Sequence, residues 1–210
     1  MIGLADLWRS RDRKLWDEAL EHYWDLVLPR NLELERRMEA LDLESIRSMD
    51  AEGWYSFLLN DYFRWKYTAP NRYATTTRSL RQYEETGQMS DLVRIKDRLL
   101  SVDRTETREA VSIAREIKGL GTAGASGLLS LMFPESFATV DQFVVKALRK
   151  VDGLPEAAAL ARMNPEGLSV ADGVVLIGIM QRKGAENNRV FGTASWTPRK
   201  VDKVLWTYGR

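Results

Sequence analysis

The chain has 210 residues, 44% of them hydrophobic and 29% charged, which is the composition of a soluble globular protein. It contains no cysteine, which excludes disulfides, thiolate nucleophiles, iron–sulfur clusters and cysteine zinc sites. A single histidine argues against histidine metal sites and Ser-His-Asp catalysis, so any chemistry falls to Asp, Glu, Lys, Tyr or water.

The net charge is +1, but the charge is unevenly distributed along the chain. Residues 1–60 hold 8 basic and 13 acidic side chains, and residues 61–210 hold 23 basic and 17 acidic ones. This asymmetry is compatible with a surface that binds nucleic acid. The longest apolar run, residues 174–180, is far too short to span a membrane, and the N-terminus lacks the features of a signal peptide. We therefore expect a cytoplasmic protein.

Helical periodicity begins at the N-terminus. Apolar residues recur at spacings of three and four over residues 4–27, which predicts one long amphipathic helix ending at Pro29. Asp50 is placed to cap a helix over residues 51–67 that is rich in aromatic side chains. The other helices expected, in chain order, cover residues 31–41, 44–49, 70–85, 91–100, a segment capped by Asp103 or Thr105 and ending at Lys118, 122–133, 141–150, a short one from Pro155, 169–186, and a last one from Pro198 capped by Thr197. The fold class predicted is all-α, with ten to twelve helices.

Two glycines, Gly119 and Gly121, separate two of these helices. Glycine allows a tight turn and lets the backbone approach a surface that a side chain would block. The helix that follows from Thr122 presents unpaired N–H groups and the positive end of its dipole, and together these features suit a phosphate oxygen. Taken alone, Gly-x-Gly more often marks an ordinary turn between helices, so the neighbouring residues decide.

The informative stretch is Ile117-Lys-Gly-Leu-Gly-Thr-Ala-Gly-Ala-Ser-Gly-Leu-Leu-Ser-Leu-Met-Phe-Pro134, followed by Val140-Asp141-Gln142-Phe143-Val144. It resembles the helix-hairpin-helix DNA glycosylase superfamily, in which a hydrophobic-Gly-hydrophobic-Gly turn and a helix of small residues precede an invariant aspartate. The interval from Gly121 to Asp141 fits that family, and the turn is most similar to the adenine glycosylase branch.

A second resemblance lies at the C-terminus. The run Trp196-Thr-Pro-Arg-Lys-Val-Asp-Lys-Val-Leu-Trp206 is similar to the closing helix of the bacterial 8-oxoguanine DNA glycosylase-like group. The pair Trp65-Lys66 also matches a Trp-Lys pair that this group often carries. The alternative for Trp196 and Trp206 is packing in the core.

The resemblance implies a single domain over residues 1–210 with two helical lobes and a cleft between them. The approximate parts are an N-terminal lobe (1–104), a helix-hairpin-helix with the helix of the catalytic aspartate (105–150), and C-terminal helices (151–210). It implies a DNA glycosylase that flips a damaged or modified base out of the duplex and hydrolyses its N-glycosidic bond. Asp141 would stabilise the positive sugar and orient or deprotonate the attacking water, although on its own it would be read as an N-cap.

The resemblance also implies which residues contact DNA. At the turn these are Gly119, Gly121, Thr122, Ala123 and Gly124. No cofactor is expected, apart from a monovalent cation that the family often shares between the hairpin carbonyls and a DNA phosphate. Arg64, Arg72 and Arg78 belong to residues 64–83, which interleave basic and aromatic side chains without an acidic one. The same stretch is equally typical of a helix with its aromatics in the core and its arginines in solvent. The candidates for the base pocket are Trp65, Tyr67, Gln142 and Trp196.

Two departures from the family bear on the reaction. Members that cleave the DNA backbone carry a lysine two residues beyond the second hairpin glycine, and Ala123 stands there, which predicts a monofunctional glycosylase. Lys66 is the exception to test, because it could reach the cleft and supply the amine of a Schiff base. The cluster cysteines of the endonuclease III and adenine glycosylase branches are also missing.

Two other functions stay open beside base excision repair. One is a non-catalytic helix-hairpin-helix DNA-binding protein, which would have no need of a carboxylate at the DNA cleft. The other is a glycosylase directed at modified foreign DNA such as that of phages. In each case we expect a monomer that acts on double-stranded DNA in the cytoplasm, associated with the nucleoid.

Overall fold

A computed structural model describes residues 2–210, in which the regular elements are all helices and no strand occurs. In chain order they are α1 (Leu4–Arg9), α2 (Arg13–Leu26), α3 (Pro29–Glu39), α4 (Leu43–Ser48), α5 (Ala51–Phe57), a π-helical segment η1 (Leu58–Tyr62), α6 (Phe63–Lys66), α7 (Pro70–Glu85), α8 (Met89–Ser101), α9 (Thr107–Arg115), α10 (Thr122–Met132), α11 (Gln142–Leu148), α12 (Ala157–Arg162), α13 (Val170–Phe191) and α14 (Pro198–Gly209). The prediction of an all-α chain is confirmed, with more and shorter helices than expected.

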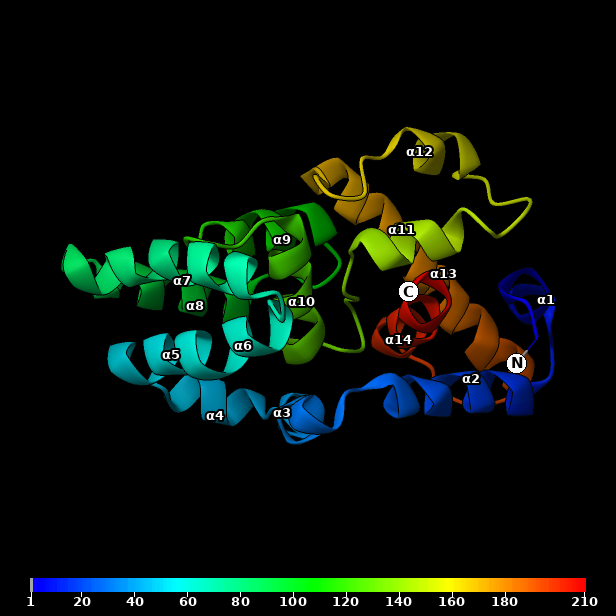
Figure 1. The fold of residues 1–210 in the computed structure, drawn as a ribbon, viewed down its shortest axis with the longest axis horizontal. Helices are drawn as coiled ribbons and strands as arrows, with labels where there is room; N and C mark the ends of the chain where they lie inside the picture. The colour runs from blue at the N-terminus through cyan, green and yellow to red at the C-terminus, as the bar shows by residue number, and fades with distance from the viewer. Residues whose placement is uncertain (1) are drawn as a thin grey trace.

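The helices form two groups (Figure 1). Helices α4–α9 lie together in one half of the molecule, and α1, α2 and α11–α14 lie in the other. Helix α10 packs on α9 in the first group and on α13 and α14 in the second, so it joins them. Helix α2 packs on α14, where Tyr23 meets Trp206 edge-on with ring centroids 5.5 Å apart. The C-terminal helix thus covers the aromatic face of α2, near the beginning of the chain.

The single helix predicted over residues 4–27 is two helices. Helix α1 ends at Arg9, Ser10 is extended, and Asp12 caps α2 by accepting the backbone N–H of Lys14 at 2.9 Å. Both helices bury apolar residues, so the periodicity continues across the break. The break is encoded in the polar residues between them, which an apolar pattern does not record.

The run predicted over residues 51–67 is continuous from Ala51 to Lys66 and begins at Asp50, whose carboxylate accepts the N–H of Gly53 at 2.8 Å. Inside it, η1 inserts a π-helical turn that the sequence pattern did not indicate. Such a turn adds a residue and rotates everything that follows it, and it is frequent at functional sites. Here it sets the orientation of α6, which carries Lys66.

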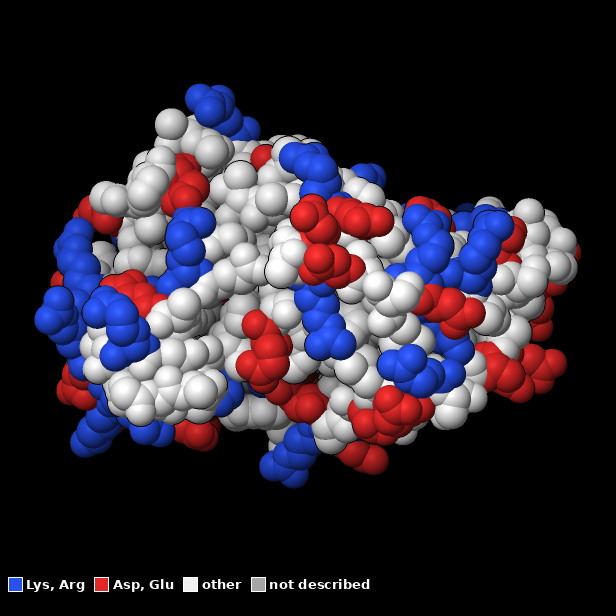
Figure 2. Space-filling model, turned by 180° about the vertical axis from the view of Figure 1, so that it is seen from behind, with Lys and Arg blue, Asp and Glu red and all other residues white. Residues whose placement is uncertain are grey.

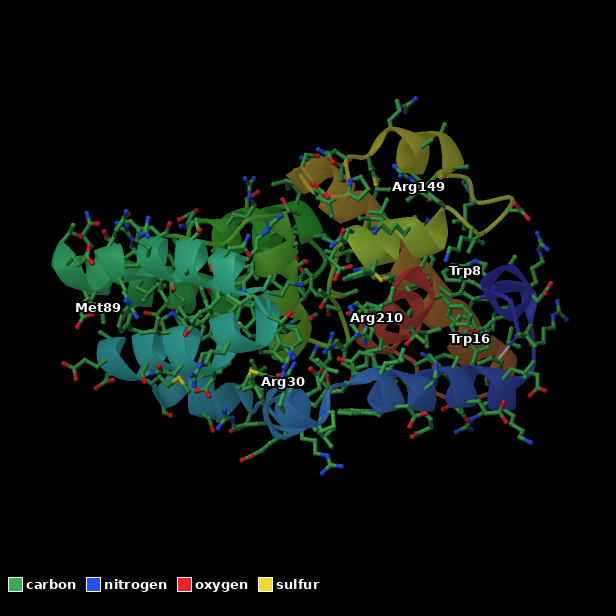
Figure 3. The ribbon with its side chains drawn as sticks, in the orientation of Figure 1. Trp8, Trp16, Arg30, Met89, Arg149 and Arg210 are labelled. Carbon is green, nitrogen blue, oxygen red and sulfur yellow. The ribbon has the colours of Figure 1, made fainter. Side chains whose placement is uncertain are left out.

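Aromatic residues fill the core at the end of the molecule where α1, α2 and α13 meet (Figure 3). The ring of Trp16 lies 6.1 Å from that of Trp8 and 5.2 Å from that of Trp196. The ammonium of Lys183 lies over both Trp8 and Trp16 and donates to the Trp8 carbonyl at 2.5 Å. No helix in the described part of the chain is both long and apolar enough to cross a membrane.

Candidate functional site

A cavity of about 400 Å³ opens where the α2–α3 connection, α6, α11 and α14 converge. Four of the residues singled out in the sequence line it: Arg64, Trp65, Lys66 and Asp141. The first three come from α6 and the fourth from the N-terminus of α11, more than seventy residues later. The fold thus brings the Trp-Lys pair and the predicted catalytic aspartate into one space.

Asp141 is the N-cap of α11. One carboxylate oxygen, Oδ1, accepts the backbone N–H groups of Phe143 at 2.9 Å and Val144 at 3.1 Å. The other oxygen, Oδ2, has no hydrogen-bond or ion-pair partner among residues 2–210. The side chain is therefore fixed by one oxygen and keeps the second available in the cavity that it lines.

The segment that leads into Asp141 is held from two sides. The N–H of Thr139 donates to Oδ2 of Asp202 on α14 at 2.6 Å, and the N–H of Val140 donates to Oγ of Ser126 on α10 at 3.0 Å. Both bonds are buried. Helix α10 begins directly after the glycine turn, so the aspartate and the turn are connected through a rigid helix.

Lys66 reaches the cavity from the last turn of α6. Its aliphatic stem runs beside Gly127 of α10, where an added Cβ would come within 3.3 Å of the lysine Cδ. Its ammonium has no hydrogen bond or ion pair to any residue from 2 to 210. Burial lowers the pKa of Lys66, against the opposing charges of Asp141 and Asp202. A lysine with a lowered pKa and no partner has the properties of a reactive amine.

Beside this pair lies a buried cluster of charges that the sequence reasoning missed. Its centre is the Arg199 guanidinium, which lies 2.8 Å from Glu39, 3.0 Å from Asp202 and 3.4 Å from Glu35. Lys203 adds a contact of 2.5 Å with Glu39. Burial raises the pKa of Asp202 to about 6, although Arg199 acts to lower it.

The cluster also holds an aromatic wall of the cavity. Glu35 accepts the Tyr23 hydroxyl at 2.5 Å with one oxygen and the Trp65 indole N–H at 2.6 Å with the other. The Arg199 guanidinium lies 5.3 Å from the centre of the Trp65 ring. Trp65 is therefore fixed in position. The lining also includes Phe143 and Trp206, whose ring centroids are 5.9 Å apart.

One signal in the sequence could have revealed this cluster. Glu35 and Glu39 are four residues apart on α3, and Arg199 and Lys203 are four residues apart on α14. Like charges at this spacing repel each other within a helix. Two such pairs of opposite sign are therefore complementary, and they predict that the two helices meet.

The turn between α9 and α10 uses its two glycines differently. Gly119 has a φ of +95°, and an added Cβ would lie 2.5 Å from the Thr76 carbonyl oxygen, so the fold itself requires glycine there. Gly121 is exposed, has a φ of −82°, and has open space where a Cβ would be. Nothing in the fold requires a glycine at Gly121.

The remaining residues expected to contact DNA at the turn are largely covered. Thr122 and Gly124 are buried, and Ala123 is half-buried. The Tyr62 hydroxyl donates to the Gly124 carbonyl. The side chains of the first turn of α10 thus serve packing, and its backbone amides are what it can offer to a ligand.

Three predicted base-pocket residues do not line the cavity. Tyr67 donates to the Gly119 carbonyl at 3.3 Å and supports the turn instead. Burial raises the pKa of Tyr67 to about 12, while the nearby charge of Arg72 opposes that shift. Gln142 begins α11 but is not part of the lining. Trp196 is 3% exposed in the core against Trp16 and does not line the cavity.

Arg72 and Arg78 lie exposed on α7, outside the cavity. On the face seen in Figure 2, basic and acidic side chains alternate without a large patch of one sign. Within the described chain, no three His, Asp or Glu side chains are grouped to hold a metal ion. Comparison of the chain with protein-family models, with curated proteins and with solved structures gave no match.

Proposed function

We propose that the chain is a DNA glycosylase, which removes a damaged or modified base from double-stranded DNA in base excision repair, as a nucleoid-associated protein of the cytoplasm. One observation carries the proposal: Asp141 lines a cavity with a carboxylate oxygen that has no partner among residues 2–210, and the amine of Lys66 lines the same cavity. The resemblance of residues 117–144 to the helix-hairpin-helix glycosylases supports the same function.

In this proposal the two groups of helices are the two lobes, and the cavity between them receives the flipped nucleotide. Trp65, Phe143 and Trp206 give the cavity aromatic walls against which a base can stack. The turn at Gly121 and the first amides of α10 bind a phosphate of the neighbouring backbone. A monovalent cation at the turn would use the Leu120 carbonyl and could share those of Gly119 and Gly121, which each accept one hydrogen bond and keep a second lone pair.

The reaction is a hydrolysis. The N-glycosidic bond breaks, its electron pair leaves with the base, and positive charge develops on the sugar. The free oxygen of Asp141 stabilises that charge and accepts a proton from the attacking water, whose oxygen bonds to C1′. The departing base takes up one proton in turn, and Asp141 returns to its ionised form by giving its proton to solvent. The products are the free base and an abasic site.

The test is a panel of duplex oligonucleotides, each carrying one modified base, scored for abasic sites. We expect the wild type to release at least one base and Asp141→Asn to release none, with DNA affinity within about twofold of wild type because the change removes a charge and little volume. Asp50→Asn is the matched control, since Asp50 also caps a helix through its carboxylate but lies outside the cavity. Asparagine caps helices about as well as aspartate, so both variants should fold. Excision by Asp141→Asn near the wild-type rate, or no excision of any base by the wild type, would contradict the proposal.

A second candidate activity is cleavage of the DNA backbone at the abasic site. The alanine at position 123 predicts base removal without cleavage of the DNA backbone. The lowered pKa of Lys66 in the cavity favours cleavage as well. The neutral amine would add to C1′ of the open sugar and lose water to form a Schiff base. Removal of a proton from C2′ would then break the C3′–O bond, so that the downstream strand leaves with a 5′-phosphate, and water would hydrolyse the Schiff base. Borohydride during turnover traps the Schiff base as a covalent adduct. We expect that adduct to be lost in Lys66→Ala and kept in Lys118→Ala, whose amine lies outside the cavity and bonds to Gln88 at 2.6 Å. Turnover without an adduct would leave a monofunctional glycosylase.

A further inference from the structure

Three arginines line the cavity and are themselves exposed: Arg30 on α3, Arg64 on α6, and Arg210 after α14. They come from three separate parts of the chain, and Figure 3 shows Arg30 and Arg210 near the centre of the molecule, at the junction of the two groups of helices. None of the three forms an ion pair with an acidic residue of the described chain. We call these three residues the arginine mouth.

Two of the three acidic residues of the same cavity lie deeper. Glu35 is 7% exposed and Asp202 is 3% exposed, and both are engaged by Arg199. Arginines without an acidic partner thus stand at the opening, while two of the acids below them are partnered and the third, Asp141, keeps one oxygen free. A ligand that fits this arrangement places negative charge against the arginines at the opening. The portion of the ligand that enters the cavity carries little net charge.

Arg210 is already held in place. It donates to the Leu26 carbonyl at 2.9 Å, and its guanidinium lies 5.0 Å from the centre of the Trp206 ring. A guanidinium has five N–H donors, so most of those on Arg210 stay available after this bond. Arg30 and Arg64 make no side-chain hydrogen bond to any residue from 2 to 210, so their donors are available too.

We propose that the arginine mouth binds the phosphates on either side of a nucleotide that enters the cavity. This inference rests on the proposed function, because it takes the ligand to be DNA. The aromatic walls below the mouth favour a nucleotide over an acidic peptide, since an unpaired base stacks on aromatic rings while its phosphates meet cations. Gly121 does not line the cavity, so the arginine mouth is a second phosphate site, separate from the turn.

The site predicts a preference for DNA in which a nucleotide can leave the stack. The test measures the dissociation constants of two duplexes of the same sequence, one intact and one with a single tetrahydrofuran abasic analogue, over a range of salt concentrations. The triple variant Arg30→Gln, Arg64→Gln, Arg210→Gln should weaken binding to the abasic duplex about tenfold or more and binding to the intact duplex less than about threefold. The slope of log K against log salt on the abasic duplex should fall by about 2 to 3, the change expected for three lost phosphate contacts.

The matched control is Arg72→Gln, Arg78→Gln, Arg81→Gln, which removes the same charge from exposed positions of α7 outside the cavity. It should change binding to the two duplexes equally. Equal losses on both duplexes in the mouth variant, or no loss on either, would overturn the inference. None of these readouts requires base removal. Selective loss on the abasic duplex together with a wild type that excises no base would therefore refute the glycosylase while supporting the phosphate site.

Discussion

Lys66 is the one lysine among the residues that line the cavity, and its amine faces charges of both signs. Burial lowers the pKa of Lys66 below its ordinary value of 10.5, Asp141 and Asp202 act to raise it, and Arg199 acts to lower it. The neutral amine is therefore more abundant near neutral pH than for a lysine in water. The ratio of neutral amine to ammonium at Lys66 depends on which acids beside it remain ionised.

Asp202→Asn should lower the pKa of Lys66 further, because the change removes one of the negative charges that favour the ammonium form. The measurement is the rate of reductive methylation of Lys66 as a function of pH, followed by mass spectrometry, which reports the free amine without requiring base excision. We expect the midpoint of the variant to move to lower pH. Asp172→Asn, remote on α13, should leave it unchanged. A midpoint that stays in place or moves to higher pH would mean that Asp202 does not act on Lys66.

At the scale of the element, the two glycines of the turn separate a structural requirement from a functional one. Gly119→Ala should destabilise the fold by about 1–3 kcal/mol, because it forces a side chain into the left-handed region and against the Thr76 carbonyl. Gly121→Ala should change the free energy of unfolding by less than about 0.5 kcal/mol, since its Cβ would meet open space. Urea unfolding of the two variants measures the difference.

The larger change Gly121→Val should weaken binding to unrelated duplexes alike, because its side chain blocks close approach of the backbone to phosphate. Unchanged dissociation constants in a folded Gly121→Val protein would mean that DNA does not contact the turn. This result would leave the stability difference between Gly119→Ala and Gly121→Ala unaffected, since that difference follows from the fold alone.

Ser126 links two elements, the helix after the turn and the segment that carries Asp141. Ser126→Ala leaves the buried N–H of Val140 without its acceptor and should cost about 1–3 kcal/mol. It should also slow excision more than it weakens DNA binding, because Asp141 lies one residue beyond Val140. Ser112→Ala is the control, since Ser112 is exposed on α9 and bonds only to its own helix. Equal stability of the two variants in urea would show that the Ser126 bond does not hold the segment.

Helices could be predicted where polar caps and apolar periodicity agree. Asp50 and Pro70 begin their helices as predicted, and Asp141 is the N-cap of the helix that follows it. The break at Ser10 and the π-helical turn η1 could not be predicted, since in both the apolar pattern runs on. The orientation of Lys66 follows from η1, so its place in the cavity depends on a feature that the pattern does not record.

At the scale of the whole molecule, the cavity is built by segments that the sequence separates widely. Asp141 could be singled out because its signal is local, a motif of a few tens of residues. Glu35 and Arg199 are 164 residues apart, and each is an ordinary charged residue within its own helix. The spacing of the charges on α3 and α14 indicates that the two helices meet, but the packing of the helices is what shows that Glu35 and Arg199 are buried beside Asp141. The motif thus predicted one side of the site, and tertiary structure supplied the other.

The buried cluster makes the stability of the whole molecule depend on Arg199, which is 5% exposed and contacts acids on both α3 and α14. Arg199→Met keeps much of the side-chain volume but removes the charge, leaving Glu39 and Asp202 without it. Breaking a buried ion pair from one side costs about 3–5 kcal/mol. We expect a loss of that size in urea unfolding near neutral pH.

The loss of unfolding free energy in Arg199→Met should depend on pH, and the direction of this dependence follows from Asp202. Burial already raises the pKa of Asp202 to about 6 against the lowering effect of Arg199, so the variant should raise it further. An acid whose pKa is higher in the folded state than in the unfolded state favours folding when protonated, and this contribution is lost as the pH rises through the folded pKa. Arg199→Met should therefore be least destabilising near about pH 5 and most destabilising near about pH 8. Adding Asp202→Asn should remove most of this dependence. A destabilisation that stays constant between these pH values, or that grows toward acid, would show that Asp202 does not carry the charge that Arg199 compensates.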